Sequence, residues 1–295
     1  MTTKILSIDG GGCRGLIPLC ILYVLEKRTG KQIYQMFDVI AGTSTGAIIA
    51  ALLSIGEPVE NIISFYIGDK IKKIFSKDLF HSIGTHCPKY DSNNIENVLK
   101  DTFGDKTFGD CLIDLLIPTD DWSNRQGVIF STFETKSIKL WQATRKSSAA
   151  ETFFSASEGC FDGGLYASNP TDLAIVKTIK HTDAKLEDLF VVSLGTGTLV
   201  DKMSQKDIAK FWWDDFAKHL IPETMDRITS KTHDILSELL DNEKYFRFQF
   251  DCPTEFESMD NVSDKNLRGL KDLADSYIST IWIKDINKII TYLKQ

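Results

Sequence analysis

One five-residue motif constrains this chain more than any other feature. Gly42-Thr43-Ser44-Thr45-Gly46 reads G-x-S-x-G, follows the apolar run from Phe37 to Ala41, and opens into the apolar segment from Ala47 to Leu53. This order predicts a strand, a sharp turn and a helix. On such a turn a serine hydroxyl is exposed at the end of a strand, and small flanking residues permit the tight geometry. The sequence therefore predicts Ser44 as a nucleophile that a substrate carbonyl can reach.

A glycine-rich motif lies upstream of this serine. Gly10-Gly11-Gly12-Cys13-Arg14-Gly15 follows a short β-rich segment and precedes a predicted helix from Leu16 to Lys27. Acyl transfer needs a nucleophile, a proton acceptor and hydrogen-bond donors for the oxyanion. Glycines let the backbone approach a ligand closely, and N–H groups at the start of a helix lie at the positive end of its dipole. We expect this loop to supply the oxyanion donors, with Arg14 as a fixed positive charge nearby.

The glycine loop has a rival interpretation as a nucleotide site. From Gly10 it satisfies G-x-G-x-x-G, the pattern of a dinucleotide-binding turn. That fold also needs an acidic residue about 20 positions later, at the end of the second strand. The second predicted strand of this chain ends instead in the Ser44 motif. A nucleotide role would leave that motif unexplained, so the oxyanion interpretation is preferred.

The proton acceptor is harder to assign. The chain has five histidines: His81, His86, His181, His219 and His233. None of them lies in a recognisable strand-end loop. Asp162 is followed by two glycines, which suit a tight loop, and partial burial would raise its pKa above the ordinary value of about 3.9. Taken alone, Asp162 is typical of an ordinary turn. Beside the other two motifs, it becomes the expected base.

The order of predicted elements indicates the fold class. Strands and helices alternate from the first motif onward, which predicts an α/β fold with a mainly parallel sheet covered on both faces. No linker or repeat interrupts the chain, so we expect one domain over residues 1–295. Further strands are predicted at Gly127–Glu134, Ile138–Thr144, Leu189–Leu194 and Tyr245–Phe250. Helical segments are predicted within Glu57–Leu116, at Ala149–Ser157, at Ile208–Leu240 with a break near Pro222, and at Asp264–Leu293.

Composition excludes several classes of function. The net charge of −7 and the lack of a long basic run disfavour nucleic-acid binding. No segment approaches the roughly 20 apolar residues that span a bilayer. The N-terminus reaches Asp9 too early for a signal peptide. The six cysteines form no C-x-x-C pair and no zinc spacing, so we expect no metal site and reduced thiols in a cytoplasmic protein.

Several segments, in this order, resemble the patatin-like phospholipase family. They are Ser7–Gly15, Phe37–Gly46, Ala143–Ala150, Asp162–Pro170, Ser193–Gly197 and Tyr245–Gln249. The resemblance implies a three-layer α/β/α fold and lipid acyl hydrolysis without a metal or other cofactor. It also implies a Ser–Asp dyad without histidine, in which Ser44 attacks the ester and Asp162 takes its proton. The oxyanion donors implied by position are Gly11 and Gly12, with their neighbours Gly10 and Cys13.

Two residues of the glycine loop carry separate expectations. The resemblance gives Arg14 either an anchoring role within the loop or contact with anionic head groups. Cys13 departs from the family pattern, because its position is often aliphatic. As a small apolar side chain Cys13 should be neutral for the fold. Its thiol is expected to make the site sensitive to oxidation or alkylation.

Several alternatives stay open at the level of sequence. The expected substrate is a phospholipid or galactolipid, but the same dyad would serve an acyltransferase or a hydrolase of soluble esters or thioesters. A non-enzymatic alternative is a ligand-gated or vestigial binding protein. Peripheral membrane contact is a further expectation, because Lys70–Lys77 has the pattern of an amphipathic helix. The preferred interpretation of that segment, and of Phe211–Phe216, is an ordinary helix with its apolar side in the core. The sequence predicts no oligomeric state.

Overall fold

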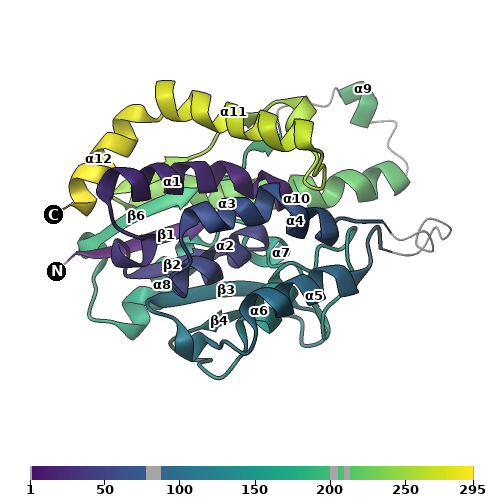
Figure 1. Cartoon of the computed structure of the whole chain (residues 1–295), viewed down its shortest axis with the longest axis horizontal. Coiled ribbons are helices and arrows are strands. Elements are labelled where there is room, and N and C mark those ends of the chain that lie inside the picture. Colours follow the sequence, from purple (N-terminus) through teal and green to yellow (C-terminus); the bar gives the residue numbers. More distant parts are fainter. Residues whose placement is uncertain (1, 78–87, 200–204, 209–212, 295) are drawn as a thin grey trace.

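A twisted sheet lies between two layers of helices (Figure 1). The structure is a computed structural model that describes residues 2–77, 88–199, 205–208 and 213–294. The sheet has the strand order β4-β3-β2-β1-β6-β8, with β5 paired to β3. Its strands are β1 (Thr3–Ile8), β2 (Val39–Gly42), β3 (Asp114–Asp121), β4 (Gln126–Ser131), β5 (Cys160–Phe161), β6 (Leu189–Leu194) and β8 (Tyr245–Phe248). A separate small ladder joins β7 (Thr198–Leu199) and β9 (Asp251–Cys252).

The helices form the outer layers. They are α1 (Leu16–Thr29), α2 (Thr45–Ser54), α3 (Val59–Ile67), α4 (Asp69–Ile74), α5 (Ser92–Phe103), α6 (Leu140–Ser147), α7 (Gly164–Ala167), α8 (Thr171–His181), α9 (Gln205–Ile208), α10 (Trp213–Leu239), α11 (Asp264–Thr280) and α12 (Ile283–Leu293). The predicted α/β fold, with three layers and a mainly parallel sheet, is confirmed.

The register of the parallel strands brings four loops to one edge of the sheet. Ile8 of β1 pairs with Gly42 of β2 and with Leu194 of β6, and Leu194 pairs with Phe248 of β8. The carboxyl ends of these strands are therefore level. The β6 strand and the second part of β1, from Ile5 to Ile8, are buried and mainly apolar, as expected for central strands covered on both faces. Segments that follow these strands meet at a common site.

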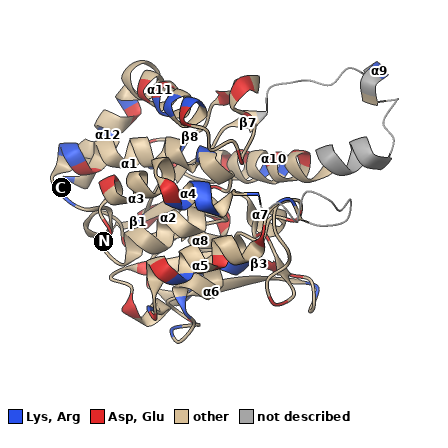
Figure 2. Ribbon diagram, turned by 45° about the vertical axis from the view of Figure 1, so that its right-hand side comes forward, with Lys and Arg blue, Asp and Glu red and all other residues tan. Residues whose placement is uncertain are grey.

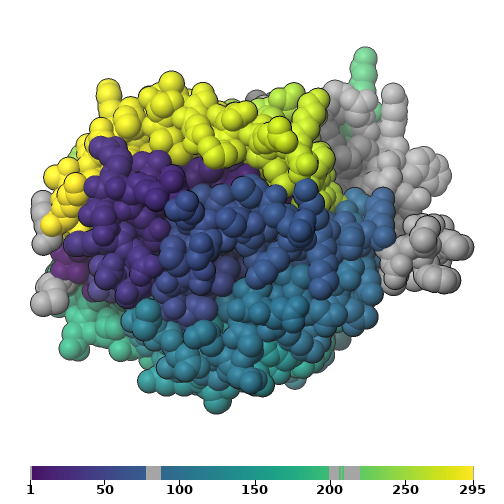
Figure 3. All heavy atoms as spheres, viewed as in Figure 1, coloured from purple at the N-terminus to yellow at the C-terminus, as the bar shows by residue number. Residues whose placement is uncertain are grey.

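Each face of the sheet has its own core. One core packs α1, α2, α3, α5, α11 and α12 against the sheet. The other packs α8 and the end of α10 against β1, β2 and β6 through residues such as Ala174, Ile175 and Leu236. Figure 3 shows the C-terminal segment in yellow lying directly on the N-terminal segment in purple, where α11 packs on α1. The two ends of the chain thus build one layer together.

Two predicted elements differ from the structure, and one strand of the structure has no counterpart among the predictions. The segment Ile138–Thr144 was expected as a strand but contains the start of α6, because Leu140, Ala143 and Ser147 recur at helical spacing on its buried face. The segment Ala149–Ser157 was expected as a helix but is irregular. The β3 strand was not predicted at all. It lies where the sequence changes from a helical to an apolar pattern near Leu115.

The long helix α10 also differs from the prediction. A break was expected near Pro222, yet Pro222 lies inside the helix. Proline removes one backbone hydrogen bond and normally bends or breaks a helix. Here α10 continues past Pro222 to Leu239 and packs on both α7 and α8. The predicted helical segment Asp264–Leu293 divides into α11 and α12 at Ile281 and Trp282.

Charged residues lie on the outer helices and on surface loops (Figure 2). The α11 helix carries both signs, and Lys72 of α4 pairs with Asp264 at the start of α11 at 2.6 Å. Among the described residues, no helix has the length and apolar character needed to cross a bilayer.

Candidate active site

Ser44 lies on a strained turn between β2 and α2. Its backbone has φ 55° and ψ −118°, a conformation that residues other than glycine rarely adopt. A Cβ at Gly42 would lie 2.1 Å from the carbonyl oxygen of Gly46, and a Cβ at Gly46 would lie 2.2 Å from that of Ile8. Both glycines of the G-x-S-x-G motif are therefore required by close backbone approach. The turn lifts the Ser44 hydroxyl out of the helix and toward the edge of the sheet.

Asp162 meets Ser44 directly. The Ser44 hydroxyl donates a hydrogen bond of 2.7 Å to Asp162 Oδ2, across 118 positions of sequence. Asp162 follows β5, which pairs with the end of β3. Its other oxygen, Oδ1, accepts the Gly164 N–H at 2.8 Å. A Cβ at Gly163 would lie 2.3 Å from the carbonyl oxygen of Pro118, so this glycine lets the loop press against β3.

Two carboxyl groups with raised pKa values share this region. Burial raises the pKa of Asp162 to about 6, while hydrogen bonds from Gly164 and Ser44 oppose the increase. Burial, with a further contribution from the negative charge of Asp162, raises the pKa of Glu151 to about 8. Glu151 Oε1 is buried and has no hydrogen-bond partner among the described residues. Burial thus favours the protonated form of both carboxyl groups, more strongly at Glu151 than at Asp162.

The glycine loop lies beside Ser44, since a Cβ at Gly10 would be 3.4 Å from Ser44 Cβ. Gly11 and Gly12 have φ values of 155° and 59°. The Gly10 N–H donates to the Ser168 carbonyl at 3.1 Å, and the Cys13 N–H donates to the Met259 carbonyl at 2.7 Å. The N–H groups of Gly11 and Gly12 donate to no residue in the described parts of the chain. Of the four predicted oxyanion donors, these two alone lack another described acceptor.

The side chains of Arg14 and Cys13 in this loop are both buried. Arg14 is 2% exposed and lines a cavity beside Ser44. Its Nε and Nη1 have no hydrogen-bond partner among the described residues. The Cys13 thiol lies 3.5 Å from the Ser258 carbonyl oxygen, and burial raises its pKa to about 12. Because the thiolate is the reactive form, this environment opposes the predicted sensitivity of Cys13 to alkylation.

A mainly apolar cavity opens beside Ser44 and Asp162. Its apolar wall comes from α2, α4, α5 and the 150–154 segment: Ile48, Ile71, Ile74, Phe75, Ile95 and Phe154. Ile71 and Ile74 are 4% and 2% exposed, so the apolar side of α4 faces the cavity and core. This supports the preferred interpretation of Lys70–Lys77 as an ordinary helix. The side chains of the 211–216 segment lie outside those that the structure describes.

The histidines whose side chains are described lie away from Ser44. His181 contacts Glu134 at 3.1 Å, and His233 contacts the Tyr245 hydroxyl at 3.1 Å. Neither lines the cavity around Ser44. His81, His86 and the His219 side chain lie outside what the structure describes. Within the described residues, no group of three or more His, Cys, Asp or Glu side chains is arranged to hold a metal ion.

Sequence reasoning missed two polar residues near the serine. The Ser147 hydroxyl accepts the Ser44 N–H at 3.0 Å and so fixes the strained turn. Glu151 lies near Asp162. The segment from Ala143 to Ala150, which resembles a family motif, contains Ser147 without indicating its role and ends one residue before Glu151.

Fold and site together define a class of protein. Residues 6–175, more than half of the chain, match the family model of patatin-like phospholipases. The chain therefore belongs to the patatin-like phospholipase family. Lipid hydrolysis is the activity that this membership supports.

Individual relatives agree with the family. Patatin-like protein 2 from rice (Oryza sativa subsp. indica) is 32% identical, over 92% of this chain and 82% of the relative. A cUMP-AMP-activated phospholipase from Escherichia coli is 28% identical, over 80% of this chain and 77% of the relative. Among solved structures, VipD from Legionella pneumophila has a TM-score of 0.52 and 13% identity, over 93% of this chain and 67% of VipD. At that identity the likeness to VipD concerns the fold alone.

Proposed function

We propose that this protein is a phospholipase A-type lipid acyl hydrolase that uses Ser44 as nucleophile and Asp162 as base. The observation that carries the proposal is the 2.7 Å hydrogen bond from the Ser44 hydroxyl to Asp162 Oδ2, at the wall of a mainly apolar cavity. The acceptor is a carboxylate whose pKa burial raises to about 6, so at neutral pH it is ionised yet more basic than an ordinary aspartate.

The reaction would proceed in two steps. Ser44 Oγ bonds to the ester carbonyl carbon while its proton passes to Asp162 Oδ2. The tetrahedral intermediate then expels the alcohol, which takes that proton, and leaves an acyl-enzyme. Water next attacks the acyl-enzyme, gives its proton to Asp162, and releases the fatty acid and a free Ser44 hydroxyl. The same group thus acts as base in the attack and as acid in the departure.

The remaining residues of the site fit separate parts of a lipid substrate. The free N–H groups of Gly11 and Gly12 would donate to the oxyanion, whose negative charge is strongly stabilised by fixed donors in a dry site. The apolar wall would hold the acyl chain, because burying each CH₂ group contributes about 0.8 kcal/mol. Arg14 would add positive potential near the oxyanion or an anionic head group.

Product analysis tests the proposal and separates its rivals. Purified protein and the Ser44→Ala variant are incubated with mixed phospholipids and galactolipids, and products are identified by mass spectrometry. We expect free fatty acid and lysolipid from wild type alone, and a fluorophosphonate label on Ser44. Acyl groups moved to an added alcohol would indicate an acyltransferase, and cleavage of soluble esters alone would indicate an esterase. A folded wild type that neither reacts nor becomes labelled would contradict the proposal.

Activity should depend on pH through the two carboxyl groups. As the pH falls through about 6, Asp162 becomes protonated and cannot accept the Ser44 proton, so kcat/KM should fall about tenfold per pH unit. As the pH rises through about 8, Glu151 ionises. The second buried negative charge opposes the charge that develops on the substrate oxygen, so kcat/KM should fall again. A soluble p-nitrophenyl ester allows the profile to be measured without lipid interfaces.

Glu151→Gln is the matched variant for this profile. It preserves size and polarity but cannot ionise. We expect the variant to retain the acidic limb near pH 6 and to lose the alkaline limb near pH 8. An alkaline limb that persists unchanged in Glu151→Gln would show that another group causes it.

A further inference from the structure

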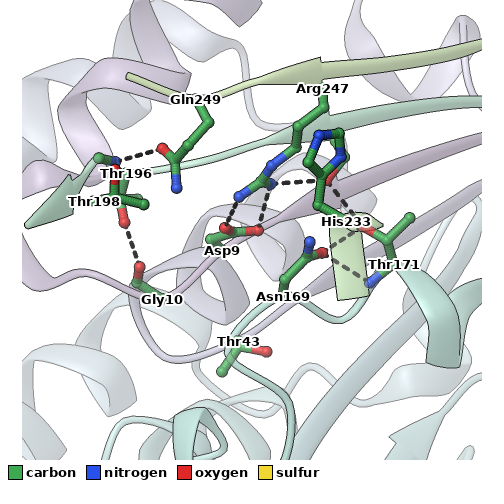
Figure 4. A network of polar contacts seen from close by, with 12 residues as sticks. Asp9, Gly10, Thr43, Asn169, Thr171, Thr196, Thr198, His233, Arg247 and Gln249 are labelled. Carbon is green, nitrogen blue, oxygen red and sulfur yellow. Dashed lines mark hydrogen bonds and ion pairs between the residues drawn. The ribbon is translucent and has the colours of Figure 1, made fainter. Parts of the chain in front are cut away.

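Five polar residues lie next to the glycine loop and take no direct part in the proposed acyl transfer. This polar network consists of Asp9, Asn169, Thr171, Ser193 and Arg247. Figure 4 labels all of them except Ser193. At its centre, Arg247 Nη1 donates to Asp9 Oδ1 at 3.0 Å and Nη2 donates to Asp9 Oδ2 at 2.5 Å. Arg247 Nη1 also donates to the Ser193 hydroxyl at 2.8 Å, across paired strands β8 and β6. One guanidinium thus joins three neighbouring strands.

The charges of this network are almost completely buried. The Arg247 and Asp9 side chains are 5% and 3% exposed. Removing two charges from water costs much of what their attraction returns, so buried ion pairs are weak stabilisers compared with apolar packing. Their advantage is geometric, because a two-pronged guanidinium–carboxylate contact fixes direction as well as distance. Stability alone is therefore a poor explanation for a charged pair at this place.

The network holds the first residue of the glycine loop from several sides. Asp9 is bonded to Gly10, and its side chain is fixed by Arg247. The Gly10 N–H donates to the Ser168 carbonyl at 3.1 Å, and the Gly10 carbonyl accepts the Thr196 hydroxyl. The next two residues, Gly11 and Gly12, carry the free N–H groups. Their direction depends on how the chain leaves Asp9 and Gly10.

The same network reaches the two dyad segments. The Ser193 hydroxyl contacts the Thr171 hydroxyl at 2.9 Å, and Thr171 contacts Asn169, the neighbour of Ser168. The residue before Ser168 is Ala167, whose carbonyl accepts a hydrogen bond from the Thr43 hydroxyl at 2.6 Å. The network therefore connects the glycine loop with the segment that follows Asp162 and with the residue before Ser44.

We propose that Arg247 is a positioning residue for catalysis. Through Asp9, it holds the Gly11 and Gly12 N–H groups in register with Ser44, where the substrate oxyanion develops. Arg247 touches no substrate. It acts on the transition state and leaves binding of the acyl chain unchanged. This inference rests on the proposed hydrolase function. Misplacement of reacting groups by about 1 Å can cost about 100-fold in rate.

Three variants test the role of Arg247. Arg247→Lys keeps the charge but loses the two-pronged contact, Arg247→Gln loses the charge, and Asp9→Asn with Arg247→Gln removes both charges. Kinetics with a p-nitrophenyl ester should show kcat reduced about 10-fold in Arg247→Lys and about 100-fold in the other two, with KM within twofold of wild type. Phe246→Leu is the control, because it changes a buried side chain of the same strand that packs on Phe190 in the other core. Its kcat should match wild type.

Each outcome has a defined meaning. If Arg247→Gln fails to fold, the charge-neutral double variant takes its place. A folded Arg247→Gln or double variant with wild-type kcat overturns the inference. So does a loss of kcat that appears equally in Phe246→Leu, because that would reflect general damage to β8. A wild type that neither hydrolyses the ester nor reacts with fluorophosphonate overturns the proposed function and this inference together. If the wild type is active, the proposed function stands and the variants test the role of Arg247 alone.

Discussion

Ser44→Ala and Asp162→Asn should each lower kcat for ester hydrolysis by about 10⁴-fold or more. Without Ser44 no oxygen attacks the carbonyl, and without a carboxylate at position 162 nothing takes the proton across the 2.7 Å contact. Residues that act as one unit show strongly non-additive losses. The double variant should therefore be no slower than the slower single variant. Steady-state kinetics with a p-nitrophenyl ester give these values.

The two dyad variants should remain folded. Burial raises the pKa of Asp162, so its ionised form destabilises the native state at neutral pH, and this penalty disappears as the pH falls through about 6. Asn carries no charge, so the Tm of Asp162→Asn at neutral pH should equal or exceed that of wild type. Ser64→Ala, on the outer face of α3, is the matched serine control and should keep full activity. Wild-type kcat in a folded Asp162→Asn variant would exclude Asp162 as the base.

Short motifs made part of this site predictable. The G-x-S-x-G turn encodes its own geometry, because Gly42 and Gly46 are required by contacts within a few residues or with the adjacent β1 strand. Asp162 was identifiable by the two glycines that follow it. Gly163 allows the loop to approach β3, and the Gly164 N–H donates to the Asp162 carboxylate. Local sequence carries such information because the backbone constraint and the functional residue are neighbours.

Other parts depend on contacts between distant segments and left no local signal. Arg247 meets Asp9 across 238 positions, and nothing near Arg247 in the sequence indicates an ion pair. The raised pKa of Glu151 comes from burial near Asp162, which depends on the irregular path of the 149–157 segment. The acceptors for the Gly10 and Cys13 N–H groups are the carbonyls of Ser168 and Met259, which lie far away in the sequence. The order of polar and apolar residues predicts the layers and the sheet. Contacts between residues far apart in the sequence form only when those layers have packed together.

The glycine loop gives the second large expected effect. Gly12 has φ 59°, and a Cβ there would lie 2.1 Å from the carbonyl oxygen of Met259. That carbonyl accepts the Cys13 N–H at 2.7 Å, so the loop and the Met259 segment would have to separate. We expect Gly12→Ala to reduce kcat by about 10²- to 10³-fold, the range for loss of an oxyanion donor. It should also lower the free energy of unfolding by more than the roughly 1–2 kcal/mol that a left-handed backbone costs alanine.

Gly30→Ala separates these two effects. Gly30 ends α1 with φ 73°, but a Cβ there would meet nothing within 4 Å. The same backbone penalty of about 1–2 kcal/mol should therefore appear without any clash and without loss of kcat. Urea unfolding and ester kinetics on both variants give the comparison. If Gly12→Ala kept the kcat of Gly30→Ala, the N–H groups of this loop would not be the oxyanion donors. A loss of kcat in Gly12→Ala alone, in protein still folded at the assay temperature, would assign the loop to the reacting centre.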